Sequence, residues 1–281
     1  MTPAAAGALR APRALAAGAT ACRALAAADG RARVLARPGG AAFLTAAGEI
    51  VWLGPATAPL HPRAVLVSAV PDVAVGTELD IDLANVTGWA PATTLDADGV
   101  ARLRTAWRAL TSDDAALGPP AGFGLLLAGA PLAFPLDGAA DAARALAVAC
   151  ARDDAAAATP AALALLGLGG GLTPSGDDFV GGALFVRRLL AVARLADAPA
   201  WDRLAGVVTE AAVTRTHPIS AALLGDLARG SGHAPLHDLV TALAAGEAPR
   251  ARRAAASLVR LGHSSGWDML AGLGAGFSLL L

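Results

Sequence analysis

The chain has 281 residues, with 22 Lys and Arg, 23 Asp and Glu, and a formal net charge of −1 at pH 7. A chain of this length can form one large domain or two smaller ones, each with a hydrophobic core. A near-neutral charge without a basic stripe excludes nucleic acid as an expected partner, because binding to a phosphate backbone requires clustered cations.

Residues 1–31 are expected to form an N-terminal helix and a loose terminus. The segment is rich in Ala, but arginines interrupt its apolar run, so it does not have the pattern of a signal peptide. We therefore expect a cytoplasmic protein. Two uncharged stretches, 115–136 and 155–176, contain Gly and Pro residues that would leave backbone groups unsatisfied in a bilayer, and no membrane association is expected.

Residues 32–95 predict a β-rich subdomain. Short apolar runs such as ARVLA, EIVWLG and AVLVSA alternate with turn residues, and AAFLTAAGEIVWLG predicts a hairpin around Ala46, Ala47 and Gly48. Several such runs favour a small antiparallel sheet or a partly closed, barrel-like sheet.

Residues 96–281 predict an all-α helical domain that carries the motifs, so the expected fold class is α+β. In helix 176–195 an apolar stripe leaves Arg187 and Arg188 turned outward. His233 and His237 are expected at the surface. The other expected helices cover residues 98–111, 137–152, 160–167, 199–214, 218–229, 235–245, 248–261 and 265–280.

One short pattern occurs twice in this helical part, in GLTPSGDDFVGG (171–182) and GHSSGWDMLAGLGAG (262–276). The simplest interpretation is structural, because Ser-x-x-Asp at a helix start is a capping box. Four positions recur with an offset of 90 residues (265 minus 175): Ser175, Gly176, Asp178 and Gly182 become Ser265, Gly266, Asp268 and Gly272.

The approach to each helix start contains more than a cap requires. Residues 167–171, GLGGG, hold four glycines, which allow positive φ and a close approach of the backbone to a ligand. Thr173 follows them, and His263 and Ser264 precede the second helix. These polar approaches favour a binding site over capping alone.

Asp177 adds a carboxylate that the capping box does not use. Two acids at the start of one helix oppose a bare anion, although a helix N-terminus otherwise attracts one. Asp177 and Asp178 therefore favour the NH₂ of an amide or carbamoyl group, or a Mg²⁺ ion. No cofactor is certain from the sequence, and Mg²⁺ is the one that these side chains would suit.

A third polar element, TRTHPISAALLGDLARG, lies between the two copies at residues 214–230. Thr216 or His217 can cap the helix and Pro218 fits its first turn, and we weigh this interpretation equally with a functional one. His217 and His263 each lie next to a helix start, where the dipole favours a neutral imidazole that can act as a base or hydrogen-bond partner.

These motifs define one candidate site, formed where the helix starts converge. We expect the catalytic residues to be Asp177, Asp178, Asp268 and His217, with Asp177 and Asp178 as the Mg²⁺ ligands if a metal binds. The expected substrate-binding residues are Gly169, Gly170, Gly171, Thr173, Ser175, Gly176, Thr216, Ser220, His263, Ser264, Ser265 and Gly266.

The stretch GLGGGLTPSGDDFVGGALFVRRLL closely resembles the signature of a bacterial family typified by the AllH-type subunit of oxamate carbamoyltransferase. The Thr216-x-x-x-Ser220 element and the terminal G-x-S-S-G-x-D-x-L-x-G are similar to the remaining motifs of this family, and the resemblance extends from about residue 30 to the C-terminus. It implies a role in purine (allantoin) catabolism, where oxalurate and phosphate are interconverted with oxamate and carbamoyl phosphate. It also implies a multi-subunit enzyme with partner subunits, including an acyl-CoA-synthetase-like one.

We therefore expect a carbamoyltransferase subunit that binds a small polar substrate with an amide or carbamoyl group. Two alternatives stay open. One is a Mg²⁺-dependent hydrolase of an N-glycosidic or amide bond, since clustered acids also suit a metal-bound water. The other is a non-catalytic subunit that binds a ligand or serves as a scaffold, because a shared fold does not determine a shared reaction.

Overall fold

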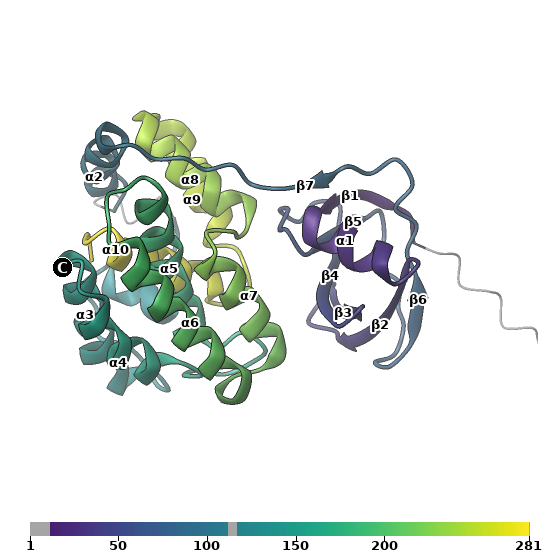
Figure 1. Cartoon of the computed structure of the whole chain (residues 1–281). Helices are drawn as coiled ribbons and strands as arrows, with labels where there is room; N and C mark the ends of the chain where they lie inside the picture. The colour runs from purple at the N-terminus through teal and green to yellow at the C-terminus, as the bar shows by residue number, and fades with distance from the viewer. Residues whose placement is uncertain (1–11, 112–116, 281) are drawn as a thin grey trace, which may run out of the picture. The chain divides into compact units, whose positions relative to one another are not determined.

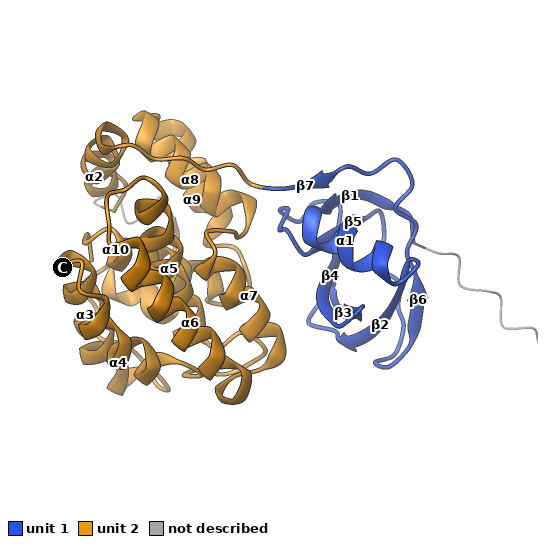
Figure 2. Ribbon diagram, viewed as in Figure 1, with its two compact units in different colours: residues 1–90 blue, residues 91–281 orange. Residues whose placement is uncertain are grey.

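The computed structural model describes residues 12–111 and 117–280. An N-terminal curled, mixed sheet is followed by a helical region (Figure 1), and the predicted α+β fold class is confirmed. The chain forms two compact units, residues 1–90 and 91–281 (Figure 2).

The first unit is a seven-stranded sheet with the order β6-β2-β3-β4-β5-β1-β7. Its inner face encloses a small core of Ala, Val and Leu side chains, to which helix α1 contributes Ala21, Ala24 and Leu25. The elements are β1 (Ala14–Gly18), α1 (Ala19–Ala27), β2 (Arg31–Ala36), β3 (Ala42–Ala46), β4 (Glu49–Pro55), β5 (Ala64–Val67), β6 (Glu78–Asp80) and β7 (Gly88–Trp89).

The hairpin between β3 and β4 is confirmed. Ala46 pairs with Glu49, so Ala47 and Gly48 form a two-residue turn. Their φ angles are 48° and 81°. Positive φ at both central residues is the type I′ geometry, whose twist matches that of the two strands.

The expected antiparallel sheet is mixed, because β4 pairs with β5 and β1 pairs with β7 in parallel. The expected N-terminal helix is also wrong for Ala14–Gly18, which forms the strand β1 between β5 and β7. Tertiary pairing overrides the helix propensity of Ala here. A Cβ on Gly18 would lie 2.2 Å from the carbonyl oxygens of His61 and Pro62, so only glycine fits at this position.

The second unit contains the predicted helices. Helix α4 begins at Ala155, before its expected start, because the side chain of Asp154 caps it by accepting a hydrogen bond from the N–H of Ala157 at 2.9 Å. The α-helices are α2 (Ala97–Thr111), α3 (Ala140–Ala151), α4 (Ala155–Leu165), α5 (Ser175–Val192), α6 (Ala198–Arg215), α7 (Pro218–Ala228), α8 (Ala234–Ala245), α9 (Ala248–Leu258) and α10 (Ser265–Gly276), with the 3₁₀ turns η2 (Gly122–Leu126) and η3 (Asp137–Ala139).

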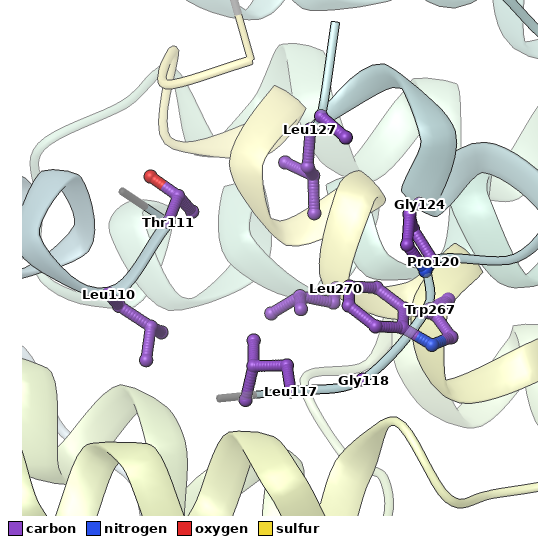
Figure 3. A pocket seen from close by; sticks show the side chains of 10 residues that line it. Leu110, Thr111, Leu117, Gly118, Pro120, Gly124, Leu127, Trp267 and Leu270 are labelled. Carbon is purple, nitrogen blue, oxygen red and sulfur yellow. The ribbon is translucent and has the colours of Figure 1, made fainter. Parts of the chain in front are cut away.

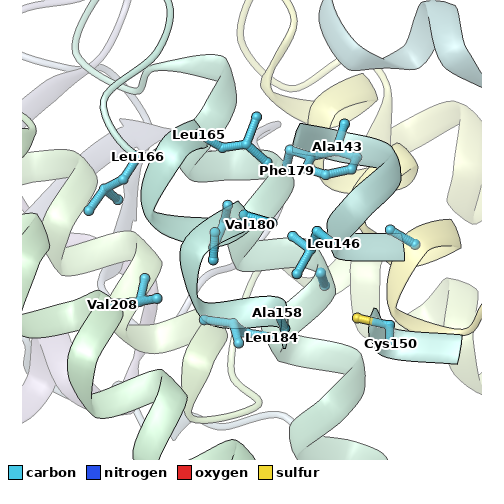
Figure 4. Packing of buried hydrophobic residues seen from close by; sticks show 14 of the residues in the cluster. Ala143, Leu146, Cys150, Ala158, Leu165, Leu166, Phe179, Val180, Leu184 and Val208 are labelled. Carbon is cyan, nitrogen blue, oxygen red and sulfur yellow. The ribbon is translucent and has the colours of Figure 1, made fainter. Parts of the chain in front are cut away.

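Helix α5 is the central element of this unit. Phe179, Val180 and Leu184 pack with side chains of α3 and α4, including Leu146 and Leu165 (Figure 4). Phe123 stacks on Phe179 with ring centroids 4.6 Å apart. The helix is buried on nearly all sides, which explains why its apolar residues exceed one stripe.

Two expectations of surface exposure are wrong. Arg187 is buried, where it forms an ion pair with Asp153 and lies over the ring of Trp201 at 4.4 Å from the centroid. His237 is also buried and contacts Thr93 Oγ1 through Nδ1 at 2.7 Å, while its Nε2 accepts from the N–H of Gly232 at 3.0 Å. Both side chains are buried with partners, as buried polar groups require.

Across residues 12–111 and 117–280, no helix has the length and apolar character needed to cross a membrane.

Candidate functional site

The repeated motif is a repeated helical hairpin, formed once by α4 and α5 and again by α9 and α10. In the first copy the N–H of Leu168 donates to Leu165 O at 3.1 Å and the N–H of Gly176 donates to Leu168 O at 2.8 Å. In the second copy Leu261 donates to Leu258 O at 2.9 Å and Gly266 donates to Leu261 O at 3.1 Å. Two equivalent backbone hydrogen bonds therefore occur in both connections.

The first connection is longer than the second. The glycines are offset by 90 residues (266 minus 176), whereas the leucines that end the preceding helices are offset by 93 (258 minus 165). The first copy thus has three additional residues in its turn, and the Gly169–Gly171 run lies in this longer segment.

Helices α5 and α10 cross closely at a glycine from each. A Cβ on Gly182 would lie 2.5 Å from Met269 O, and a Cβ on Gly272 would lie 2.1 Å from Phe179 O. Real Cβ atoms do not approach a carbonyl oxygen this closely, so both positions require glycine for packing. The crossing brings the two helix starts together.

Hydroxyl groups connect these two starts. Thr173 Oγ1 and Ser265 Oγ are 3.1 Å apart, and Ser175 Oγ and Ser264 Oγ are 3.2 Å apart. Segments about 90 residues apart in the sequence therefore meet at one place, as we expected for a single site.

The capping-box interpretation is wrong for both helices. Pro174 is the N-cap of α5 and Ser264 is the N-cap of α10, and neither helix start has a side-chain capping bond. Ser175 and Ser265 are the first helical residues, and their hydroxyls bond across to the other copy instead. The carboxyl groups of Asp178 and Asp268 are consequently not explained by capping.

Asp178 and Asp268 are buried, with 6% and 0% of their surfaces exposed. Asp268 Oδ1 accepts a hydrogen bond from the N–H of Phe123 at 2.6 Å. Within the described part of the chain, Oδ2 of each carboxyl group has no hydrogen-bond partner. Buried polar atoms without partners are rare and costly, so this pair of oxygens requires a functional explanation.

Burial raises the pKa of Asp268 to about 6, opposed by hydrogen bonding from the Phe123 N–H and from Ser264 and Ser175. Burial also raises the pKa of Asp178 well above its ordinary value, and the charge of Asp268 raises it further. The hydroxyls of Ser264 and Ser175 lie close enough to Asp268 to lower its pKa. Their hydrogen bond, however, is to each other, with the two oxygens 3.2 Å apart. Burial therefore shifts both carboxyl groups towards the protonated form, compared with an exposed aspartate.

Asp177 has a different environment from its neighbour Asp178. Its Oδ1 accepts from the N–H of Gly167 at 2.7 Å, and its Oδ2 accepts from the hydroxyls of Ser220, at 2.6 Å, and Thr216. With both oxygens occupied, Asp177 joins the start of α5 to the loop after α4 and to the start of α7. The donor set therefore does not fit a Mg²⁺ ion held by Asp177 and Asp178.

Residues 12–111 and 117–280 contain no group of three or more His, Cys, Asp or Glu side chains placed to hold a metal ion.

The two candidate histidines lie at the edges of the site. His217 is the N-cap of α7, and its Nδ1 accepts from the N–H of Ile219 at 3.1 Å, which is the capping role that the sequence left open. His263 is exposed in the turn before α10. The structure thus brings together the acids and hydroxyls at the starts of α5 and α10, while His217 caps the N-terminus of α7.

The glycines of the site have distinct roles. Gly176 and Gly266 are packing residues, because a Cβ on either would lie 1.9 Å from the carbonyl oxygen that ends the preceding helix. Gly169 has φ 116°, and a Cβ there would lie 2.8 Å from Ser175 N. Gly170 is exposed, and no described atom lies within 4 Å of a Cβ placed on it. Packing within the chain therefore does not explain the glycine at position 170.

Phe123 and Gly122 are site residues that the sequence did not reveal. A Cβ on Gly122, whose φ is 55°, would lie 2.1 Å from Asp268 Oδ1. Glycine at this position allows the backbone of η2 to approach the carboxyl group and the next N–H to bind it. The only sequence signal is the concentration of Gly between residues 118 and 124.

An apolar pocket lies beside the second copy of the motif (Figure 3). Trp267, which occupies the position of Asp177 in the first copy, lines it with Leu110, Leu127 and Leu270. The pocket does not include Asp178, Asp268 or the bridging hydroxyls among its lining residues. It is therefore distinct from the acid pair.

Residues 165–277 match the model of a family described as oxamate carbamoyltransferase subunit AllH. The match covers the end of α4, the complete α5 to α10 region and both copies of the motif. No curated protein and no solved structure matches the chain.

Proposed function

We propose that this chain, whose residues 165–277 match the AllH family model, is the carbamoyl-binding subunit of an oxamate carbamoyltransferase. One observation supports this proposal most strongly, namely the buried, unpartnered Oδ2 atoms of Asp178 and Asp268 where α5 and α10 begin. Carboxyl oxygens that the fold does not use are suited to the NH₂ group of a carbamoyl compound, which offers two donors.

The surrounding groups would bind the rest of such a substrate. The backbone of Gly169–Gly171 and the hydroxyls of Thr173, Ser175, Ser264 and Ser265 provide donors for negative charge that develops on the carbamoyl oxygen. The N–H groups of Gly176 and Gly266 are not available to a substrate, because both donate to carbonyl oxygens of the chain. Asp177, with Thr216 and Ser220, would hold these parts in place.

The proposed reaction is the interconversion of oxalurate and phosphate with oxamate and carbamoyl phosphate, in bacterial purine (allantoin) degradation in the cytoplasm. The family description names a subunit, which supports the presence of partner subunits. An acyl-CoA-synthetase-like chain is our proposal for one of them. His217 and His263 remain proposed contributors at the rim, as polar groups next to helix starts.

The first test is ligand binding to the full chain. We expect oxalurate, oxamate or carbamoyl phosphate to raise the melting temperature, corresponding to about 2.7 kcal/mol at a hundredfold excess over Kd. Asp178→Asn should abolish the shift. Asp141→Asn, at an exposed ion pair on α3, is the matched control and should retain it.

Turnover in the complex assembled with its partner subunits separates the proposed function from its alternatives. Formation of carbamoyl phosphate that requires phosphate supports the transferase. Product release that requires Mg²⁺ but not phosphate would instead identify a hydrolase. Ligand-induced stabilisation without turnover in the complete complex would identify a non-catalytic subunit.

A further inference from the structure

We propose that Asp178 and Asp268 hold one proton between them and pass it, through the serine hydroxyls at the helix starts, to the nitrogen that leaves the carbamoyl carbon. This inference rests on the proposed function and assigns the acid of that reaction. Two observations support it: the two carboxyl groups are buried next to the crossing of α5 and α10, and two hydrogen-bonded pairs of hydroxyls lie at the starts of these helices.

The two acids belong to equivalent positions of the repeated hairpin. The glycine crossing of α5 and α10 brings them close, and the charge of Asp268 acts on Asp178. Both lie in a water-excluded region in which two neighbouring carboxylates repel each other strongly. Such a pair loses its two protons in separate steps. At pH values between the two steps, the pair holds one proton.

In the described part of the chain, the groups that act on the pair do not include a cation. On α5 the neighbouring charge is Asp177, which also raises the pKa of Asp178, and from η2 the contact is the neutral N–H of Phe123. On α3, which packs against α10, Asp141 and Arg144 form an exposed ion pair with each other. Arg260, after α9, and His263 are exposed. A proton is therefore the simplest means of neutralising this site.

Hydroxyl groups lie near the buried pair at the helix starts, and in the described part of the chain none of them is hydrogen-bonded to either Oδ2 atom. Ser265 lies close enough to Asp178 to lower its pKa, and the Ser265 hydroxyl is hydrogen-bonded to that of Thr173 at 3.1 Å. Ser264 and Ser175 likewise lower the pKa of Asp268, and their hydroxyls are hydrogen-bonded to each other at 3.2 Å. All four hydroxyl residues are partly exposed, whereas the Oδ2 atoms are not. A hydroxyl can accept one proton while donating another, so these residues can relay a proton from the pair to the leaving nitrogen.

The proposed step is balanced. A phosphate oxygen bonds to the carbamoyl carbon of oxalurate, and the bond from that carbon to the bridging nitrogen breaks. The electron pair of the broken bond remains on the nitrogen, which takes the proton of the acid pair and leaves as the NH₂ group of oxamate. The proton of hydrogen phosphate returns to the pair, which holds one proton before and after the reaction.

The experiment measures kcat against pH for the assembled complex with oxalurate and phosphate, and follows the protonated carboxyl band of the same proteins by infrared spectroscopy. In the wild type we expect the band to persist at pH 7 and kcat to fall as the pair loses its last proton. Asp178→Asn and Asp268→Asn should each lower kcat by about 10²–10⁴-fold. Each should also move the pH at which the remaining acid ionises downward, because the neighbouring negative charge is gone.

Asp141→Asn is the control and should leave both profiles unchanged. Fully ionised carboxyl groups in the wild type at pH 7, or a pH profile that neither Asn variant moves, would overturn the shared proton and its transfer. Failure of the wild-type complex to convert oxalurate at any pH would instead refute the proposed function, and the infrared titration would still decide whether the pair shares a proton.

Discussion

The turns of the two helical hairpins share two backbone hydrogen bonds but differ in length and in what surrounds them. The α4–α5 hairpin has three additional residues, a glycine run and Asp177, whereas the α9–α10 hairpin has Trp267 at the equivalent position and a shorter turn. Their common Gly and Asp positions form the crossing and the acid pair, and each common Ser bonds to a hydroxyl residue without a counterpart, Ser175 to Ser264 and Ser265 to Thr173. Positions common to both copies therefore build most of the centre of the site, while the unmatched positions complete the hydroxyl bridges and form the surroundings.

The largest effect should follow from filling the two equivalent turns. Gly176→Ala and Gly266→Ala each place a methyl group 1.9 Å from a leucine carbonyl oxygen. We expect each to lower the free energy of unfolding by about 3 kcal/mol or more, since the overlap is with backbone and can be relieved only by moving a helix. Chemical denaturation measures the loss. If one copy tolerates Ala while the other does not, the two turns are not equivalent.

The acid pair, Asp178 and Asp268, should lower the stability of the folded chain when it ionises. The folded-state pKa of Asp268 is about 6, above the ordinary 3.8, so the ionised form is disfavoured in the folded chain. The free energy of unfolding should therefore fall as the pH rises from about 4 to about 6. Asp268→Asn removes this loss and should be more stable than the wild type above pH 6, by as much as about 3 kcal/mol.

This prediction for Asp268→Asn is checked by denaturation at several pH values, with Asp141→Asn as the exposed control. The gap between Asp268→Asn and the wild type should close below pH 4, where both side chains are neutral. An Asn variant that is less stable than the wild type at pH 8 would show that the folded chain stabilises the ionised carboxylate of Asp268.

The unmatched Asp177 should behave in the opposite way. Its carboxylate accepts hydrogen bonds from Gly167, Thr216 and Ser220, so Asp177→Ala should lower the free energy of unfolding by about 2 kcal/mol. Asp177→Asn keeps one acceptor oxygen and should lose less. Denaturation at pH 7 compares these variants with Asp178→Asn, and a stabilising Asp177→Ala would contradict the bracing role.

The smallest effect on stability should come from the additional loop. Gly170→Ala adds a methyl group where no described atom lies within 4 Å, and we expect a change within about 0.5 kcal/mol. The same variant should weaken the oxalurate-induced rise in melting temperature, because the methyl group blocks approach to the backbone. An unchanged rise would remove the glycine run from the binding site.

Sequence reasoning located the two helix starts but not the division of roles between adjacent acids. The repeated Ser-Gly-x-Asp pattern predicted the convergence that the Thr173–Ser265 and Ser175–Ser264 bonds confirm. The sequence predicts that both Asp177 and Asp178 bind the ligand, although only Asp178 belongs to the repeated pattern. Successive residues turn by about 100° around a helix, so Asp177 faces α7 while Asp178 faces α10, and only the packing of those helices shows which acid is left without a partner.

The sequence by itself determined what depends on local periodicity and turn chemistry: the helical second half, the Ala47–Gly48 hairpin and the doubled helix start. The tertiary structure alone decided the parallel pairings, the strand Ala14–Gly18, the burial of Arg187 and the approach of Phe123 to Asp268. The physical reason is distance along the chain. These features depend on contacts between residues far apart in sequence, and neither propensity nor periodicity contains that information.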